Sequence, residues 1–435
     1  MTLKPYKIAI IGFGTVGEGV YETIEKKSEK LGLLLGRQVE VPVVLVKNGD
    51  KPRQVSRKTE ITTSFDLILN KKEIDAVVEA TPDAATGYPY AAALLEKGVS
   101  VITANKELVA KHGEELQRLA ERSGADLLYE AAVAGGIPLL NTLRHTLKTN
   151  TIDKLEGILN GTSNYILTKM RTERAPFTSA LEEAQEKGYA EAVPDKDVDG
   201  WDAYYKTTIL SRWIYGKSPV WQDNAPRGIR NVASEDIKLA EKAGGRLKHI
   251  ASLVKRGTEV HASVTPCFLL DNHPLYNVEG VNNGINIEGS IVGSVLLQGP
   301  GAGKFPTASA VVEDLVNLLK NKHELPESKG TEFLSHGLNK EAGEHSDEDN
   351  SVYFLAWDGS AAKKAALPGE AVLWQSENEF GTSAAIVHFP GESARGLEKF
   401  QRNGGRVYPL STNNPVNTIR ADISKEEGKK RLSYI

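Results

Sequence analysis

The sequence of 435 residues predicts an α/β protein with a Rossmann-type doubly wound parallel sheet, a second α+β domain and a small C-terminal domain. Three observations support this prediction. Short apolar runs alternate with helical patterns in the first 150 residues, the alternation stops near residue 150, and a β-α-β-β-α-β order fills residues 351–435. The chain is also too long for one ordinary hydrophobic core, so we expect two or three domains.

The first 150 residues read as a dinucleotide-binding domain. Apolar, β-branched runs predict strands that are buried on both faces of a parallel sheet. Helical patterns separate these strands, as a doubly wound sheet requires. We expect strands at 7–11, 41–46, 75–80 and 99–103, and helices at 16–30, 64–71, 84–97 and 107–123.

Residues 151–305 are expected to form an α+β domain for substrate binding and dimerisation. Its predicted strands are 152–159, 260–264, 284–288 and 290–297, and its predicted helices are 163–172, 177–187 and 201–214. A helix at 306–322 is expected to pack back on the first domain. A polar linker should follow at 323–350.

The last segment, 351–435, has the element order of a ferredoxin-like fold. The expected strands are 352–357, 371–375, 383–389 and 406–410, with helices at 360–366 and 394–402. ACT domains share this order. The Asp-x-Pro-Gly loop usual in ACT domains is replaced here by Asp358-Gly359-Ser360, so a stabilising or dimerising appendage is the alternative interpretation.

Composition excludes several classes of protein. The formal net charge is -4 and no basic stripe is present, so neither nucleic acid nor a membrane surface is an expected partner. Cys267 is the single cysteine, which excludes an intrachain disulfide and a CxxC metal site. No secretory signal or membrane-span pattern is found, so a cytoplasmic enzyme is expected.

A glycine-rich loop, Gly12-Phe13-Gly14-Thr15-Val16-Gly17, lies between the first strand and the first helix. In this context the glycines allow a tight turn, close approach of a pyrophosphate and close packing of helix on strand. The second strand ends at Val46, where an acidic residue would bind the ribose of NAD. Lys47 follows instead, and Arg57 lies in the next loop, which favours NADP over NAD.

Two lysines are candidates for proton transfer. Lys106 follows the fourth strand, at the edge of the sheet where ligands bind. Lys206 shares a predicted helix face with Asp202, and apolar neighbours on that helix would desolvate it and lower its pKa. Asp202 would act in the opposite direction. An exposed ion pair is the simpler alternative for this i,i+4 spacing.

Six ordered motifs between residues 6 and 320 resemble the homoserine dehydrogenase family. They are GFGTVGEGV (12–20), VITANK (101–106), EAAVAGGIP (130–138), ILNGTSNYIL (158–167), the acidic stretch 188–206 and GPGAGKFPTASAVVED (299–314). One departure is Val193 before Pro194, where the family usually reads Glu-x-Asp-Pro. We expect it to alter the capping of that loop rather than the chemistry.

The resemblance implies an activity, the reversible NAD(P)-dependent reduction of L-aspartate 4-semialdehyde to L-homoserine in threonine and methionine biosynthesis. It also implies residue roles. Lys206 matches the acid/base, although Lys106, beside the nicotinamide, is the alternative. The implied substrate-binding residues are Gly161, Thr162, Tyr189, Glu191, Asp197 and Asp202. Besides the glycine loop, Lys47, Arg57 and Lys106, the assigned cofactor residues are Thr81, Thr103 and Gly303.

The resemblance further implies a monovalent cation, usually sodium, held by Glu130 and the carbonyl groups of Val133, Gly135 and Ile137. Oxygen ligands of this kind suit hard cations. A Gly-rich hinge is the alternative, and both can hold. A homodimer or homotetramer is expected, with threonine as a possible effector at the C-terminal domain.

Competing functions remain open from the sequence alone. Another Rossmann oxidoreductase acting on an amino-acid derivative is one, and a catalytically silent dinucleotide-binding regulator is another. Aspartate semialdehyde dehydrogenase is disfavoured because it needs a cysteine nucleophile, whereas Cys267 lies in a strand-rich segment and should pack as a small hydrophobic residue. A fusion with an aspartokinase is disfavoured because the chain starts at the dinucleotide fold.

Overall fold

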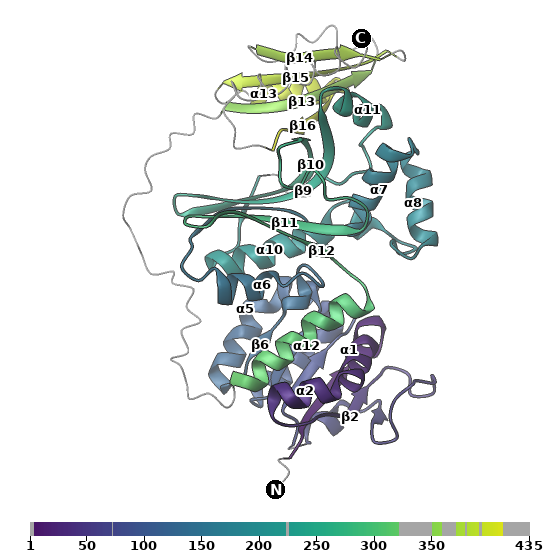
Figure 1. Cartoon of the computed structure of the whole chain (residues 1–435), viewed down its shortest axis with the longest axis vertical. Coiled ribbons are helices and arrows are strands. Elements are labelled where there is room, and N and C mark those ends of the chain that lie inside the picture. The colour runs from purple at the N-terminus through teal and green to yellow at the C-terminus, as the bar shows by residue number, and fades with distance from the viewer. Residues whose placement is uncertain are drawn as a thin grey trace.

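The computed structural model describes residues 4–71, 73–222, 226–321, 350–358, 371–378, 381–390 and 394–411. Three sheets follow one another along the long axis of the molecule (Figure 1). The first is parallel, the second is mixed and the third is antiparallel, which confirms the predicted fold class. The division of the chain at residues 150, 305 and 350 stays a prediction.

The first sheet has six parallel strands in the order β3-β2-β1-β4-β5-β6. The order reverses between β1 and β4, and ligands of such sheets bind outside the carboxyl ends of the strands at this point. The strands are β1 (Tyr6–Ile11), β2 (Val39–Leu45), β3 (Glu60–Thr62), β4 (Ala76–Glu79), β5 (Ser100–Thr103) and β6 (Leu127–Leu128).

The helix predicted at 16–30 is in fact two helices, α1 (Thr15–Lys26) and α2 (Ser28–Leu35). The apolar stripe of α1 ends at Ile24. The polar Lys27 and Ser28 occupy the positions at which the next apolar residue of this stripe would lie. Lys27 leaves the helical conformation with φ -109° and ψ 14°. The remaining helices of this region are α3 (Phe65–Leu69), α4 (Ala84–Glu96) and α5 (Lys106–Ser123).

Helix α12 (Lys304–Asn321) lies against α1, although it follows the second sheet in the chain (Figure 1). A Cβ atom on Gly19 of α1 would lie 2.7 Å from the carbonyl oxygen of Lys304, so the two backbones are in close contact. The loop before α12 is therefore brought next to the glycine loop before α1. Within the described residues, no helix combines the length and apolar character needed to span a membrane.

The second sheet has the order β12-β11-β7-β9-β10-β8, and α10 packs between it and the first domain (Figure 1). Its strands are β7 (Ile152–Ile158), β8 (Val220–Trp221), β9 (Gly245–Arg256), β10 (Glu259–Leu270), β11 (Asn282–Gly289) and β12 (Gly293–Pro300). The helical segments around it are η1 (Glu130–Ala132), α6 (Leu139–Asn141), η2 (Thr142–Thr146), α7 (Gly161–Thr172), α8 (Phe177–Glu186), α9 (Asp195–Val198), α10 (Trp201–Tyr215) and α11 (Ser234–Lys242).

Several strand predictions in this sheet are wrong or incomplete. Strand β10 extends well beyond the predicted 260–264, and the short β8 was not expected. Strand β12 starts at Gly293 rather than at 290, because residues 290–292 form the hairpin turn, and the exposed Ile291 there imitates a strand residue. Strand β9 was not expected, because charges interrupt its apolar pattern. Its Lys248 is nevertheless buried and donates hydrogen bonds to the carbonyl oxygen of Val278 at 2.6 Å and to Glu279 at 2.8 Å.

The third sheet has the order β14-β15-β13-β16 and is antiparallel throughout. Its elements are β13 (Asn350–Asp358), β14 (Ala371–Glu377), β15 (Thr382–Pro390), α13 (Ala394–Arg402) and β16 (Arg406–Pro409). Strand β15 lies between β13 and β14, as a split β-α-β arrangement requires. The helix predicted at 360–366 and the linker predicted at 323–350, apart from Asn350, lie outside the described residues.

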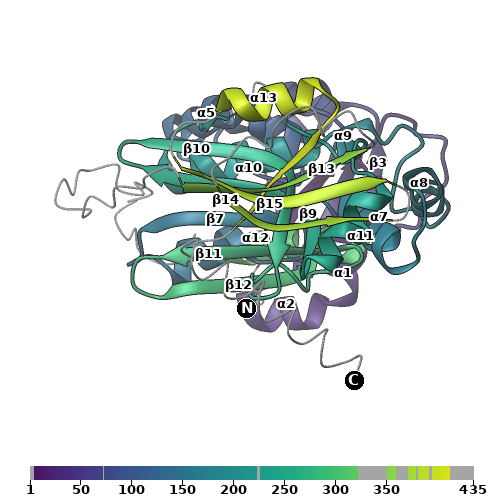
Figure 2. The same ribbon diagram turned by 90° about the horizontal axis from the view of Figure 1, so that it is seen from above.

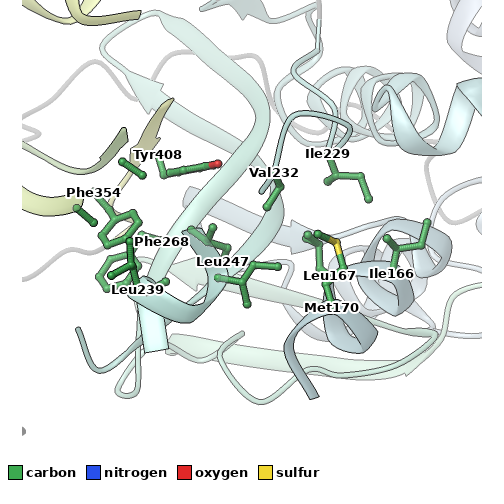
Figure 3. Packing of buried hydrophobic residues seen from close by; sticks show 14 of the residues in the cluster. Ile166, Leu167, Met170, Ile229, Val232, Leu239, Leu247, Phe268, Phe354 and Tyr408 are labelled. Carbon is green, nitrogen blue, oxygen red and sulfur yellow. The ribbon is translucent and has the colours of Figure 1, made fainter. Parts of the chain in front are cut away.

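The third sheet packs directly on the second domain. Seen from above, its strands lie over those of the second sheet (Figure 2). Phe354 of β13 stacks on Phe268 of β10 with ring centroids 4.9 Å apart, and Leu239, Leu247 and Tyr408 belong to the same buried cluster (Figure 3). The opposite face of the sheet carries a separate small core that includes Phe400 of α13.

A buried ion pair strengthens this contact. Asp236 of α11 is fully buried and accepts hydrogen bonds from Arg406 at 2.6 and 2.9 Å and from the hydroxyl group of Tyr408 at 2.5 Å. Burial raises the pKa of Asp236, while Arg406 and Tyr408 oppose that rise. The carboxylate therefore depends on its partners in the third sheet to stay charged.

Replacing Arg406 with methionine should lower the free energy of unfolding by about 3 kcal/mol or more, because Asp236 stays buried without its cation. Chemical denaturation of the whole chain measures this change. Arg402→Met is the matched control, because Arg402 pairs with Glu398 while 80% exposed and should cost less than about 1 kcal/mol. Equal losses for the two variants would contradict the structural role of Arg406.

Candidate active site

The glycine loop joins β1 to α1 at the point where the strand order reverses. Gly12 has φ +89°, and a Cβ atom there would lie 2.5 Å from the carbonyl oxygen of Ala80. A Cβ atom on Gly17 would lie 2.0 Å from the carbonyl oxygen of Gly12. Gly14, by contrast, faces open space at the N-terminus of α1. Free N–H groups at this helix end suit a pyrophosphate.

Lys47 and Arg57 are exposed beyond the carboxyl end of β2. The amide of Gly12 donates to the carbonyl oxygen of Leu45 at 3.0 Å, so the chain leaves β2 beside the glycine loop. The amide of Ser56 donates to the hydroxyl group of Tyr21 at 2.7 Å, which holds the loop of Arg57 against α1. Both cations therefore lie on the side of the site where the second strand ends.

A buried glutamate that sequence analysis missed organises the predicted Thr81 and Thr103. Glu79 ends β4 and is fully buried. Its carboxylate accepts hydrogen bonds from the amide of Thr81 at 2.7 Å and from the hydroxyl group of Thr103 at 2.5 Å. The pKa of Glu79 is raised overall, because the effect of burial outweighs the hydrogen bonds from Thr103 and Thr81, which favour the charged carboxylate. The signal in the sequence was a lone carboxylate inside an apolar run.

Lys206 lies one turn after Asp202 on α10, which begins after Gly200. Its ammonium group is largely buried and donates to the carbonyl oxygen of Leu159 at 2.7 Å and to Asp202 Oδ2 at 2.9 Å. Burial lowers the pKa of Lys206, and this effect outweighs the opposing charge of Asp202. The simpler interpretation, an exposed ion pair, is therefore wrong.

Lys106, the first residue of α5, forms an ion pair with the other oxygen of Asp202. Its side chain is 40% exposed. The charge of Asp202 raises the pKa of Lys106 and exceeds the opposing effect of burial. The two lysines hold the pKa of Asp202 well below its usual range, although burial acts in the opposite direction. One buried carboxylate thus joins the candidate lysines of both domains.

Asn160 is a second residue that sequence analysis missed. Its side-chain amide donates to Asp197 at 2.8 Å and to Asp202 at 2.9 Å, while its oxygen caps α7 by accepting from the amide of Ser163 at 2.8 Å. Burial, followed by the charge of Asp202, raises the pKa of Asp197. An Asn that precedes a helix start in the sequence was the available signal.

The remaining predicted substrate residues lie around this cluster with different exposures. Thr162 is buried and donates to the carbonyl oxygen of Tyr189 at 2.6 Å, and Gly161 lies tightly against Val281. The side chain of Tyr189 is 44% exposed. Glu191 is exposed, yet its charge contributes to the raised pKa of Lys106, so it lies within electrostatic reach.

The departure at Val193 affects a surface position. Val193 is 72% exposed, and the short helix α9 that follows begins with no side-chain cap. Asp195 at the start of this helix and Asp199 just after it form ion pairs with Arg230. The loop therefore obtains support from an ion pair in place of a capping carboxylate.

The predicted cation residues lie in a buried segment between the first two sheets. Glu130 accepts hydrogen bonds from the amides of Leu140 at 2.8 Å and Asn141 at 2.6 Å, and its own amide donates to Asp314 at 2.9 Å. Burial and the charge of Asp314 raise the pKa of Glu130 to about 7, and burial raises the pKa of Asp314 to about 6.

The three carbonyl residues of this segment differ in what they contact. Val133 and Ile137 are buried, and Gly135 has φ +59° with the carbonyl oxygen of Gly301 against it. The carbonyl oxygen of Ile137 already accepts from the amide of Leu139 at 2.8 Å. No group of three or more His, Cys, Asp or Glu side chains in the described part of the chain is arranged to hold a metal ion. Main-chain oxygens would therefore have to supply most ligands.

Gly303 is exposed with φ +118° and directly precedes α12, beside α1. Cys267 is buried in β10, and burial raises the pKa of its thiol group. A thiol kept protonated in this way cannot serve as the nucleophile that an aspartate semialdehyde dehydrogenase needs.

Together these groups can transfer a proton beside a dinucleotide site. A desolvated ammonium group, two carboxylates and a second lysine meet where the first sheet ends and α10 begins. Such an arrangement suits oxidation of an alcohol or reduction of a carbonyl group, with charged groups available to bind an amino acid.

Comparisons with known proteins agree with this chemistry. Residues 12–130 match the family model for the homoserine dehydrogenase NAD binding domain, and residues 138–316 match the model for homoserine dehydrogenase. The homoserine dehydrogenase of Bacillus subtilis is 39% identical over 320 residues, which cover 73% of this chain and 74% of the relative.

Solved structures extend the similarity to the C-terminal part. The homoserine dehydrogenase of Thiobacillus denitrificans is 30% identical with a TM-score of 0.81, covering 94% of this chain and 99% of that one. A hyperthermophilic archaeal homoserine dehydrogenase, solved in complex with NADPH, is 28% identical with a TM-score of 0.61, covering 74% of this chain and 99% of that one. The chain therefore belongs to the homoserine dehydrogenase family of NAD(P)-dependent oxidoreductases.

Proposed function

We propose that Lys206 is the acid and base of the homoserine dehydrogenase reaction in this chain. The observation that carries the proposal is the set of partners of its buried ammonium group. An ammonium group has three N–H donors. The carbonyl oxygen of Leu159 takes one and Asp202 takes another, which leaves one for the substrate oxygen.

The nicotinamide, when bound, supplies or accepts the hydride. Lys206 donates a proton to the oxygen of aspartate semialdehyde on reduction, and its amine accepts the hydroxyl proton of homoserine on oxidation. The lowered pKa of Lys206 makes its proton easier to lose than that of an exposed lysine, which favours exchange between these two forms. Another kind of Rossmann oxidoreductase and a silent regulator are both disfavoured by the family match.

The other polar groups have supporting roles in this proposal. Asp197 and Glu191 bind the cationic amino group of the substrate. Asp202, which the family resemblance also assigns to the substrate site, holds the two lysines there. Gly161, Thr162 and Tyr189 form the wall of the substrate pocket. Lys106, the first residue of α5 beside the cofactor site, stabilises negative charge on the substrate. The contact of Asp202 with both lysines supports this division of roles.

Lys206→Met should reduce kcat for homoserine oxidation by about 100-fold or more, because positioned acid–base groups contribute at least that factor. The Kd of the oxidised cofactor should stay nearly unchanged. Steady-state kinetics and a fluorescence titration measure the two quantities. Lys196→Met is the control, since that lysine is 64% exposed and pairs with Glu107. A kcat close to that of the unmodified chain would refute the assignment.

NADP is proposed as the preferred cofactor. The glycine loop and the residues Thr81, Thr103, Lys106 and Gly303 would line the site, and Lys47 and Arg57 would bind the 2′-phosphate. The exposed cations beyond β2 support this, as does the archaeal relative solved with NADPH. An acidic residue, which would repel that phosphate, is missing at position 47.

Lys47→Asp should raise the KM for NADP about tenfold or more, because one charge-assisted contact to the 2′-phosphate is lost. The KM for NAD should change little. Both values come from the homoserine-dependent reduction of each cofactor. Lys51→Asp makes the same charge change in the same exposed loop and controls for long-range effects. The proposal fails if Lys47→Asp weakens NAD and NADP binding equally.

A monovalent cation, with sodium as the first choice, is proposed for the segment of Glu130, Val133, Gly135 and Ile137. These residues fit it in chemistry, since carboxylate and carbonyl oxygens bind hard cations. Two buried carboxylates, Glu130 and Asp314, lie together there and would be partly neutralised by the ion. The ion would stabilise the junction between the first two sheets.

Sodium chloride should raise the Tm above that measured in tetramethylammonium chloride at equal ionic strength. A ligand at ten times its Kd stabilises the folded state by about 1.4 kcal/mol. In Glu130→Gln the difference between the salts should disappear. Glu313→Gln, a substitution next to Asp314, is the control variant. If both salts give the same Tm for the unmodified chain, the cation proposal is wrong.

Three further proposals concern the oligomeric state, an effector at the third sheet and the cellular location. A homodimer or homotetramer is supported by exposed apolar side chains on the outer hairpin of the second sheet, Ile291, Val292 and Leu296. An ACT-like role for the third sheet, with threonine as effector, is supported by its strand order. A cytoplasmic location is supported by the single cysteine, which allows no intrachain disulfide.

A further inference from the structure

The carbonyl oxygen of Leu159 has two donors, and only one of them is Lys206. The side-chain amide of Asn283, the second residue of β11, donates to the same oxygen at 2.9 Å. The lysine donates at 2.7 Å. A carbonyl oxygen has two lone pairs and can accept both hydrogen bonds. Asn283 therefore helps to set the orientation of the Leu159 carbonyl group toward Lys206.

Asn283 is fully buried, and its side-chain position is closely restricted. A Cβ atom on Gly301 would lie 2.1 Å from Cγ and Nδ2 of Asn283, so the amide lies flat against that backbone. Gly301 belongs to the loop before α12. On the side of Gly301 away from Asn283, a Cβ atom on Gly135 would lie 2.3 Å from the carbonyl oxygen of Gly301. Asn283 thus connects the loop of Gly303 to the acceptor of Lys206.

The amide of Asn283 is also incompletely satisfied. Among the described residues, its Oδ1 atom has no hydrogen-bond partner. A buried polar atom without a partner destabilises a fold, and an apolar side chain of similar size would avoid that loss. Turning the amide over would place two acceptors against each other at Leu159. The N–H contact to Leu159 is therefore the favourable interaction that this side chain makes.

We propose that Asn283 is a positioning residue for Lys206, acting through the carbonyl group of Leu159 that both side chains share. The inference rests on the proposed acid–base role of Lys206. Because the amide proton takes part of the negative charge on the Leu159 oxygen, it weakens the stabilisation of the lysine's charged form. It also keeps the oxygen aimed so that one ammonium N–H remains directed at the substrate.

Two substitutions test this inference in the full chain. Asn283→Leu removes the donor and leaves Leu159 to solvate the ammonium group alone, which should favour the charged lysine. Asn283→Asp, nearly equal in size, adds a negative charge and should favour the charged lysine further. The midpoint of the kcat–pH profile for homoserine oxidation should rise by about half to one pH unit in Asn283→Leu and by more in Asn283→Asp.

Asn164→Leu is the matched control. Asn164 is also fully buried with an unpartnered Oδ1, and its amide donates to the carbonyl oxygens of Asn282 at 3.1 Å and Val278 at 3.3 Å. It has no hydrogen bond to Leu159. Its removal should change Tm by a similar amount without moving the pH profile, and the KM for NADP should stay within about twofold in all three variants.

The outcomes separate this inference from the proposed function. If Lys206→Met loses activity but the Asn283 profiles coincide with that of Asn164→Leu, the positioning role is wrong while the acid–base role stands. If Lys206→Met keeps its kcat, the proposed function itself is wrong. If both Asn283 variants fail to fold while Asn164→Leu folds, Asn283 is a structural residue only, and the inference is again overturned.

Discussion

Asp202 is the constraint on which the rest of the site depends. Its carboxylate is buried, and a buried charge persists only when it is paired. The two cations that pair with it come from different parts of the chain, Lys106 from the carboxyl edge of the first sheet and Lys206 from its own helix. The attraction therefore joins α5, which follows the first sheet, to α10, which packs on the second sheet.

The same ion pairs give the two lysines opposite properties. Lys106 is partly exposed, so the charge of Asp202 dominates and keeps it protonated. Lys206 is buried, so desolvation dominates and lowers its pKa. Asn160 keeps Asp197 beside this group despite the repulsion between the carboxylates. A permanent cation and an exchangeable one can thus lie on either side of a single carboxylate.

Local patterns predicted four of the six strands of the first sheet, because β1, β2, β4 and β5 are apolar runs bounded by glycine and helix signals, as in 7–11 before the glycine loop. The short strands β3 and β6 carry no such signal and were missed. Local patterns also failed where tertiary partners override composition. Lys248 is acceptable inside β9 only because Glu279 and the carbonyl group of Val278 are near, which no local window contains. Of the site, the family motifs led to Lys106, Asp202 and Lys206, but Glu79, Asn160 and Asn283 act through contacts distant in sequence.

The stacking of Phe354 on Phe268 has a consequence for the autonomy of the C-terminal sheet. Each of the two units leaves one apolar face that only the other covers, and Asp236 is buried in the seam between them. A fragment that ends with α12 would expose Phe268 and its neighbours to water. It would also leave the carboxylate of Asp236 without its counterion, Arg406. The last segment is therefore a structural half of one shared core, and separating it would require a redesigned surface on both sides.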